Sequence, residues 1–146
     1  MVDIKRVGIC QKGTISLIDL LNHARENLKL EQGGAIATFT GIVRGYTHDG
    51  KKVNKLEIEA SEDEALKTLA EISKELCERP GVIDVLIYHL VGEFYVSDDL
   101  VYIVVTGKSR IDAFQALEEA VERYKKNAEI WKKEYLEDGS CYWISE

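Results

Sequence analysis

The chain has 146 residues, of which 45% are hydrophobic and 31% charged, and its formal net charge is −7. This length and composition predict one globular domain spanning 1–146 and exclude an intrinsically disordered chain. The acidic balance argues against nucleic acid as a partner, because neutralising backbone phosphates requires a basic surface.

The cysteines and the N-terminus indicate the cellular compartment and argue against two kinds of cysteine site. Cys10, Cys77 and Cys141 are odd in number and widely spaced, which argues against a zinc ribbon and against a disulfide framework. We find no cluster of metal ligands in the sequence and expect no metal site. The first residues lack an apolar signal core and no segment could span a bilayer, so we expect a cytoplasmic protein without membrane contact.

The predicted elements alternate between strands and helices along the chain. Period-two alternation and β-branched runs predict strands over 2–10, 35–43, 55–60, 82–91, 100–106 and 140–144. Apolar stripes at helical spacing predict helices over 14–30, from 61 to 76, and from 109 onward. This order predicts one α+β domain with a mixed or antiparallel sheet and about three helices.

Serine residues mark the expected start of each helix. Ser16 stands three residues before Asp19, and Ser61 stands three residues before Glu64, the spacing of a capping box. Ser109 has the same relation to Asp112. We therefore expect side-chain caps at all three positions.

The stretch 124–134 places four lysines around one tryptophan in an acidic chain. If the backbone stays helical, Lys125 and Lys132 are nearly two turns apart and project from one face, although a break near Ala128 to Ile130 would change the angle between them. Trp131 would pack inward beside them and form a flat apolar wall. Two ammoniums over an aromatic surface suit a flat anion, or an acyl group that develops negative charge. The alternative is an ordinary amphipathic helix end, with lysines near the negative pole of the dipole and the tryptophan in the core.

Two arginines stand where a strand or helix opens to a glycine-containing segment. Arg44 follows the buried strand over 35–43, where it is either an end-cap that reaches solvent or an anchor for an anion. Arg110 lies in the first turn of the last helix, against the preference of the helix dipole for acidic residues, which favours an anion nearby. His89, near the end of the strand over 82–91, is expected to be a hydrogen-bonded core residue.

Four stretches together resemble one family, the large, catalytic subunit of molybdopterin synthase (the MoaE family). They are Gly34 to Arg44 with its Phe-Thr-Gly-Ile-Val-Arg end, His89 to Glu93, Ser109 to Phe114, and Lys125 to Glu134 with Trp-Lys-Lys-Glu. The similarity extends from about Gly34 to Trp143. It departs from the family pattern at Leu90 and Ser109, where an arginine and a histidine are usual, and at Glu129, where a proline is usual.

The resemblance implies an α/β hammerhead-type fold and a homodimer within a heterotetramer. A small ubiquitin-like sulfur carrier would insert its C-terminal Gly-Gly thiocarboxylate into a pocket and pass sulfur to cyclic pyranopterin monophosphate, without any other cofactor. The implied catalytic residues are Lys125 and Lys132. The implied substrate-binding residues are Arg44, Arg110, Ser109, Phe39 and Trp131.

The chemistry of this transfer is compatible with a lysine pair. Both the thiocarboxylate and the cyclic phosphate are anionic, and a leaving oxygen needs an acid, so a cationic pocket is required. Two other functions are compatible with the same basic face: a non-catalytic module that binds an acidic peptide or a small phosphorylated ligand, and a scaffold subunit.

Overall fold

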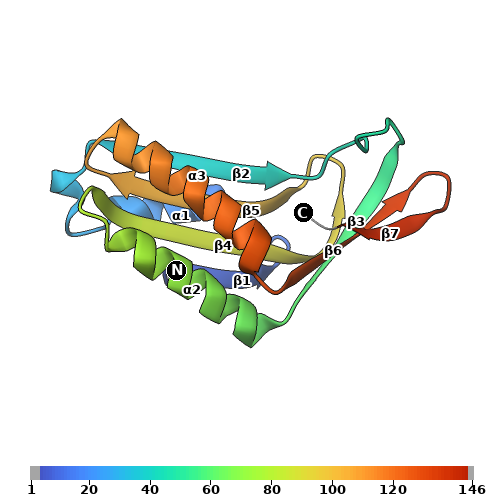
Figure 1. Cartoon of the computed structure of the whole chain (residues 1–146), viewed down its shortest axis with the longest axis horizontal. Helices are drawn as coiled ribbons and strands as arrows, with labels where there is room; N and C mark the ends of the chain where they lie inside the picture. Colours follow the sequence, from blue (N-terminus) through green and yellow to red (C-terminus); the bar gives the residue numbers. More distant parts are fainter. Residues whose placement is uncertain (1–3, 145–146) are drawn as a thin grey trace.

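The structure, a computed structural model, describes residues 4–144. Its strands are β1 (Val7–Gln11), β2 (Ala35–Ile42), β3 (Val53–Ala60), β4 (Val82–Tyr95), β5 (Asp99–Gly107), β6 (Ile130–Leu136) and β7 (Cys141–Ile144). Its helices are α1 (Leu17–Arg25), α2 (Glu62–Cys77) and α3 (Arg110–Asn127), with a short 3-10 turn, η1 (Leu30–Gln32). The predicted α+β class with three α-helices is confirmed (Figure 1).

The strands form one mixed sheet whose two halves are joined by the long strand β4. The strand order is β2-β5-β4-β3-β6-β7, and β1 lies beside β4 in parallel, while the other pairings are antiparallel. The first part of β4 pairs with β5 and β1, and its last residues, from Gly92 to Tyr95, pair with β3. As a result β3, β6 and β7 project beyond the helices as a separate head (Figure 1).

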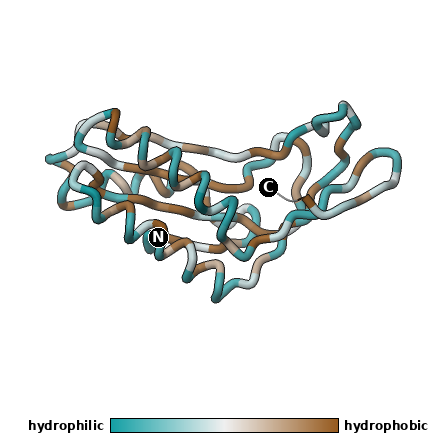
Figure 2. Tube along the Cα trace, in the orientation of Figure 1, coloured by the Kyte–Doolittle hydropathy of each residue, from teal (hydrophilic) through white to brown (hydrophobic). Residues whose placement is uncertain are grey.

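The core lies between the sheet and the helices. In Figure 1, α2 and α3 lie side by side over one face of the sheet and α1 lies behind the other. Because helices cover both faces, β4 is buried from Val82 to Leu90 and β5 from Leu100 to Gly107, and both carry near-continuous apolar runs. Figure 2 shows these two strands as the hydrophobic centre, with hydrophilic residues along the outer sides of the helices.

Some predicted boundaries differ from the observed ones for local reasons. The helix predicted over 14–30 ends at Arg25, because the Asn27 side chain accepts a hydrogen bond from the Lys29 N–H (2.8 Å) and forms a turn instead. The strand predicted to end at 91 continues to Tyr95. Gly92 tolerates a positive φ of 125° within the strand, and the turn comes at Ser97 (φ 76°).

Two of the three predicted caps are confirmed. Ser16 forms a complete capping box with Asp19, and the Ser109 hydroxyl accepts a hydrogen bond from the Asp112 N–H (3.2 Å). Ser61 is the residue before α2, but its side chain makes no capping hydrogen bond, so that prediction is wrong. Within residues 4–144, no helix is long and apolar enough to cross a membrane.

The expectation that the helix continues through Lys132 is wrong. α3 ends at Asn127, Ala128 is extended (φ −74°, ψ 139°), and the chain enters β6, which pairs with β3. The Glu129 carbonyl accepts the Ser61 N–H (3.0 Å), and its carboxylate accepts the Thr68 hydroxyl (2.8 Å). These bonds, to the N-cap of α2 and to a residue within that helix, hold the chain extended where helical periodicity alone predicts a continuing helix.

Candidate active site

Lys125 and Lys132 line one small pocket although they belong to different elements. The pocket has a volume of about 50 Å³ and is lined by His89, Tyr124, Lys125, Ala128, Ile130, Lys132 and Ile144. Lys125 lies in the last turn of α3 and Lys132 on β6, so the change of direction at Ala128 brings the two side chains to the same cavity. The spacing of seven residues would place Lys125 and Lys132 on one face only in a continuous helix. In the structure, the turn into β6 brings their side chains together instead.

His89 forms part of this pocket from the sheet side. It is fully buried on β4, its ring packs edge-on against Tyr124 with centroids 5.6 Å apart, and its Nδ1 lies 2.8 Å from the Leu90 carbonyl oxygen. A carbonyl only accepts, so Nδ1 carries the proton. The expectation of a hydrogen-bonded core histidine is confirmed, and the structure adds that this histidine borders the lysine pocket.

Strand alternation separates the lysines of β6. Successive side chains of a strand point to opposite faces, so Lys132 and Lys133 face different ways. The Lys133 ammonium lies 5.5 Å from the ring centroid of Tyr135 and 5.7 Å from that of Trp143. Trp131 is on the same side as Lys133 and is 49% exposed. The expectation that Trp131 packs inward is therefore wrong, because it was based on a helical rather than an extended backbone.

Arg44 lies at a second, wider cleft that adjoins the first. This cleft has a volume of about 480 Å³ and is lined by Arg44, Thr47, His48, Asp49, Tyr142, Trp143 and Ile144. Ile144 lines both cavities, so the lysine pocket and the arginine cleft meet at the end of β7.

The Arg44 guanidinium is oriented by a buried carboxylate. Its Nε and one terminal nitrogen donate to the two oxygens of Glu134, at 3.3 and 3.4 Å. Glu134 is 1% exposed and also accepts the Tyr142 hydroxyl at 2.6 Å, a bond that raises the pKa of Tyr142. The sequence analysis gave no role to Glu134 or Tyr142. It treated the chain near Glu134 as helical, and only the alternation of a strand places the Glu134 side chain inward.

Arg110 and Ser109 lie at the other end of α3. Fifteen residues of helix separate Arg110 from Lys125, which corresponds to about 22 Å along the axis. Arg110 is exposed, and the Ser109 hydroxyl both caps the helix and donates to the Asp112 carboxylate at 2.9 Å. Within one chain these two residues are not brought to the lysine pocket.

Phe39 is half-buried on β2, where it pairs with Ile103 and packs against the hydrophobic core. It lines neither the lysine pocket nor the arginine cleft. One chain therefore brings together Lys125, Lys132 and, next to them, Arg44.

Comparison with known proteins identifies the family. Residues 11–127 match the family model described as MoaE protein. The molybdopterin synthase catalytic subunit of Staphylococcus aureus is 45% identical over 111 residues, covering 75% of this chain and 74% of that protein. That of Pyrococcus abyssi is 37% identical over 111 residues, covering 76% and 74%.

A solved structure extends the likeness to the whole chain. The crystal structure of molybdopterin synthase from Staphylococcus aureus superposes with a TM-score of 0.86 at 36% identity, covering 99% of this chain and 100% of that one. The match therefore includes the β6–β7 segment that carries Lys132 and Glu134, beyond the residues matched by the family model. This chain belongs to the MoaE protein family.

Proposed function

We propose that this chain is the catalytic subunit of a molybdopterin synthase, which converts cyclic pyranopterin monophosphate to molybdopterin in molybdenum cofactor biosynthesis. The relatives with which it shares three quarters of its length carry that name. The single observation that carries the proposal beyond family membership is the convergence of Lys125 and Lys132 on one pocket.

The lysine pocket suits a thiocarboxylate as the sulfur source. The sulfur attacks a side-chain carbon of the pterin, a C–S bond forms, and the oxygen that leaves that carbon takes a proton from a lysine ammonium. Water then cleaves the acyl–sulfur bond, which leaves a carboxylate on the carrier and the sulfur on the pterin. The second ammonium stabilises the oxyanion formed during this cleavage. Two such transfers supply both sulfurs, so the carrier provides the sulfur without a resident cofactor.

The size of the pocket restricts which part of a carrier enters. The lysine pocket, at about 50 Å³, is much narrower than the adjoining arginine cleft at about 480 Å³. A narrow pocket admits a slender chain end without side chains more easily than one with bulky residues. This supports a small partner subunit with a C-terminal Gly-Gly tail.

The adjoining cleft presents an oriented guanidinium to the substrate, with part of its charge offset by Glu134. Glu134 fixes the plane of the Arg44 guanidinium, and a fixed guanidinium binds a phosphate or the polar edge of a pterin with defined geometry. We place the substrate in this cleft, with its reacting carbon toward Ile144, where the cleft meets the lysine pocket.

Arg110 and Ser109 can contribute only from a second copy. Near the start of α3 the apolar side chains Ile111 and Phe114 are 57% and 61% exposed, and β2 forms one edge of the sheet. In a two-fold dimer that packs α3 against its symmetry mate in antiparallel orientation, the start of one helix lies beside the end of the other. We infer a homodimer of this kind, with one carrier bound to each copy in a heterotetramer.

The competing function is a non-catalytic module that binds an acidic tail through the same lysines. The Lys132→Ala variant distinguishes the two functions when it is assayed with a thiocarboxylated carrier and cyclic pyranopterin monophosphate. A synthase loses molybdopterin formation while carrier binding, measured by calorimetry, changes less than about tenfold. If carrier binding itself is abolished while sulfur transfer by the residual complex is normal, the chain is a binding module.

A further inference from the structure

A groove of about 580 Å³ runs between β1 and α2, apart from the site described above. It is lined by Lys5, Arg6, Val7, Gly8, Ile9, Cys10, Leu66, Lys67, Ala70, Ser73, Lys74 and Tyr88. None of these residues lines the lysine pocket or the arginine cleft. The proposed sulfur transfer gives this groove no role.

The groove follows a strand edge with backbone groups that point away from the sheet. Among the described strands, β1 pairs with β4 alone. The Ile87 N–H donates to the Arg6 carbonyl (2.9 Å) and the Lys12 N–H to the Val91 carbonyl (3.0 Å), so the even-numbered residues of β1 face β4. By alternation, the N–H and C=O groups of Val7 and Ile9 point outward.

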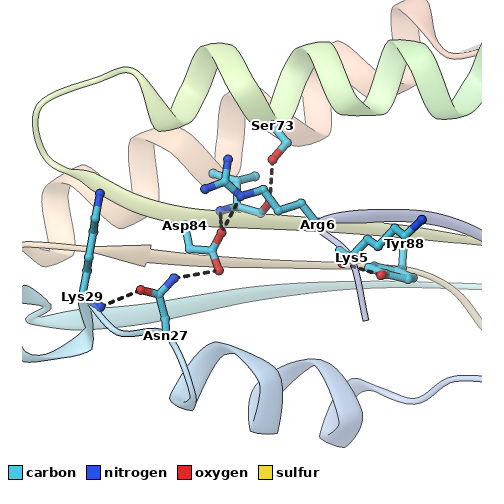
Figure 3. A network of polar contacts seen from close by, with 8 residues as sticks. Lys5, Arg6, Asn27, Lys29, Ser73, Asp84 and Tyr88 are labelled. Atoms are coloured by element: carbon cyan, nitrogen blue, oxygen red, sulfur yellow. Dashed lines mark hydrogen bonds and ion pairs between the residues drawn. The ribbon is translucent and has the colours of Figure 1, made fainter. Parts of the chain in front are cut away.

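Side chains from both faces of the sheet line the groove, which places it along the strand edge. Leu66, Ala70 and Ser73 come from α2, above one face. Tyr88 belongs to the opposite face, where its ring covers Gly8 and its hydroxyl donates to the Lys5 carbonyl (Figure 3). An extended chain laid in this groove would therefore lie beside β1 as a further strand.

The rim of the groove is cationic in a chain of net charge −7. Lys5 and Arg6 come from the β1 side and Lys67 and Lys74 from α2; among the described lining residues none is acidic. Arg6 forms an ion pair with the buried Asp84 at 3.3 Å, visible beneath α2 in Figure 3, so the net attraction for an anion comes mainly from the three lysines. The floor between them is apolar, formed by Val7, Ile9, Leu66 and Ala70.

We propose that this groove binds an extended acidic segment of a partner protein, which adds a strand to the β1 edge. Lys67 and Lys74 are separated by about 10.5 Å along the helix, which lies between the spans of two and four strand residues, roughly 6.7 and 13.4 Å, at which side chains share a face. Long lysine and glutamate side chains can bridge the difference. Glutamates at alternate positions of a bound strand lie on one face, beneath α2, and can reach both lysines with the aliphatic part of each side chain over the apolar floor. The β-branched residues between them point to the opposite face of the sheet, on the side of Tyr88.

A second copy of this chain does not suit the groove. Pairing β1 with its own symmetry mate would bring two sets of the same cations together, and like charges facing each other destabilise a strand pair. Lysines at an edge strand oppose self-association of this kind. The charge pattern thus selects a partner of opposite charge.

A peptide alternating glutamate and valine over about ten residues, blocked at both ends and fluorescently labelled, tests the proposal directly. We expect saturable binding by anisotropy, weakened about fivefold or more by Lys67→Glu and by Lys74→Glu. Lys29→Glu, the same charge change at an exposed position outside the groove, should leave the affinity within about twofold. Methylating alternate backbone nitrogens of the peptide should abolish binding, because strand addition requires its N–H donors. Circular dichroism confirms that each variant is folded.

Three results would overturn the proposal. The first is no binding at millimolar peptide. The second is equal weakening by Lys29→Glu, which would indicate attraction to the whole protein rather than to the groove. The third is undiminished binding of the methylated peptide, which would show an ionic contact without strand addition. None of these results bears on sulfur transfer, since the groove shares no residue with that site.

Discussion

At the scale of single residues, the buried carboxylate of Glu134 is the key contact of the arginine cleft. It accepts hydrogen bonds from Arg44 and Tyr142 while 1% exposed. Glu134→Gln removes the charge and turns one acceptor into a donor, so we expect the free energy of unfolding to fall by about 1–3 kcal/mol, measured by urea denaturation.

The matched control is Glu137→Gln. Glu137 forms an ion pair with Lys52 at 3.4 Å, and both side chains are more than half exposed, so the control should cost less than about 0.5 kcal/mol. Equal effects of the two substitutions would refute a special role for Glu134.

Asp98 gives a pH-dependent prediction at the same scale. Its carboxylate accepts a hydrogen bond from the Lys12 ammonium (2.6 Å) and from the Tyr95 N–H (2.8 Å), and these bonds lower its pKa. Because the pKa is lower in the folded than in the unfolded state, the ionised group stabilises the fold above about pH 4. That contribution is lost as the pH falls through the folded pKa. Asp98→Asn should therefore be less stable than the natural chain at pH 7, and the difference should shrink at pH 3. A difference that is constant between the two pH values would show that ionisation of Asp98 is not involved.

At the scale of elements, the sequence best predicts the strands and helices whose apolar residues recur with a regular period. The strands over 35–43 and 100–106 and the amphipathic helix that begins after Ser109 agree closely in position with β2, β5 and α3. The expectation that the first of these strands is buried is wrong, because β2 lies at the edge of the sheet and only Ala37 in it is buried. β6 was missed, because lysines and glutamates around Trp131 suit a helix locally. The strand forms because β6 pairs with β3 and because Glu129 bonds to Ser61 and Thr68. Both are contacts between distant parts of the chain.

The α3–β6 junction can be tested through Thr68. Its hydroxyl donates to the Glu129 carboxylate, and this junction separates Lys125 from Lys132. Thr68→Val removes the donor at nearly constant volume and should lower the free energy of unfolding by about 0.5–1.5 kcal/mol. It should also reduce the turnover of sulfur transfer more than Thr38→Val does, a control on an exposed position of β2. Reduced stability with unchanged turnover would mean that the junction does not position the lysines.

The residues of the candidate site were predictable to different degrees. The family resemblance implied Lys125, Lys132 and Arg44, whereas the lysine-rich stretch around Trp131 and the place of Arg44 after an apolar strand left ordinary structural roles open; the structure gathers the three residues around Ile144. The inward face of β6 was not predictable without its backbone conformation, so Glu134 was missed.

At the scale of the whole molecule, the proposed dimer depends on the exposed start of α3. Phe114→Glu places a charge in that interface, and we expect light scattering to show a monomer at micromolar concentration. The control is Ile18→Glu, because Ile18 is 68% exposed on α1, on the opposite face of the sheet. A natural chain that is monomeric at all concentrations tested, or a Phe114→Glu variant that remains dimeric, would contradict this arrangement. Loss of the dimer should also reduce sulfur transfer, since Arg110 reaches a lysine pocket only from a second copy.

The most direct measurement of the central claim compares four single lysine variants in one sulfur-transfer assay with a thiocarboxylated carrier. Lys125 and Lys132 line the pocket, whereas Lys126 is exposed and Lys133 lies over the rings of Tyr135 and Trp143. We predict that Lys125→Ala and Lys132→Ala each lower turnover by about a hundredfold or more, the scale of a lost general acid or oxyanion donor. Lys126→Ala and Lys133→Ala should stay within about threefold of the natural chain. Larger losses from Lys126→Ala or Lys133→Ala, or normal turnover in all four variants, would contradict a catalytic pocket built by Lys125 and Lys132.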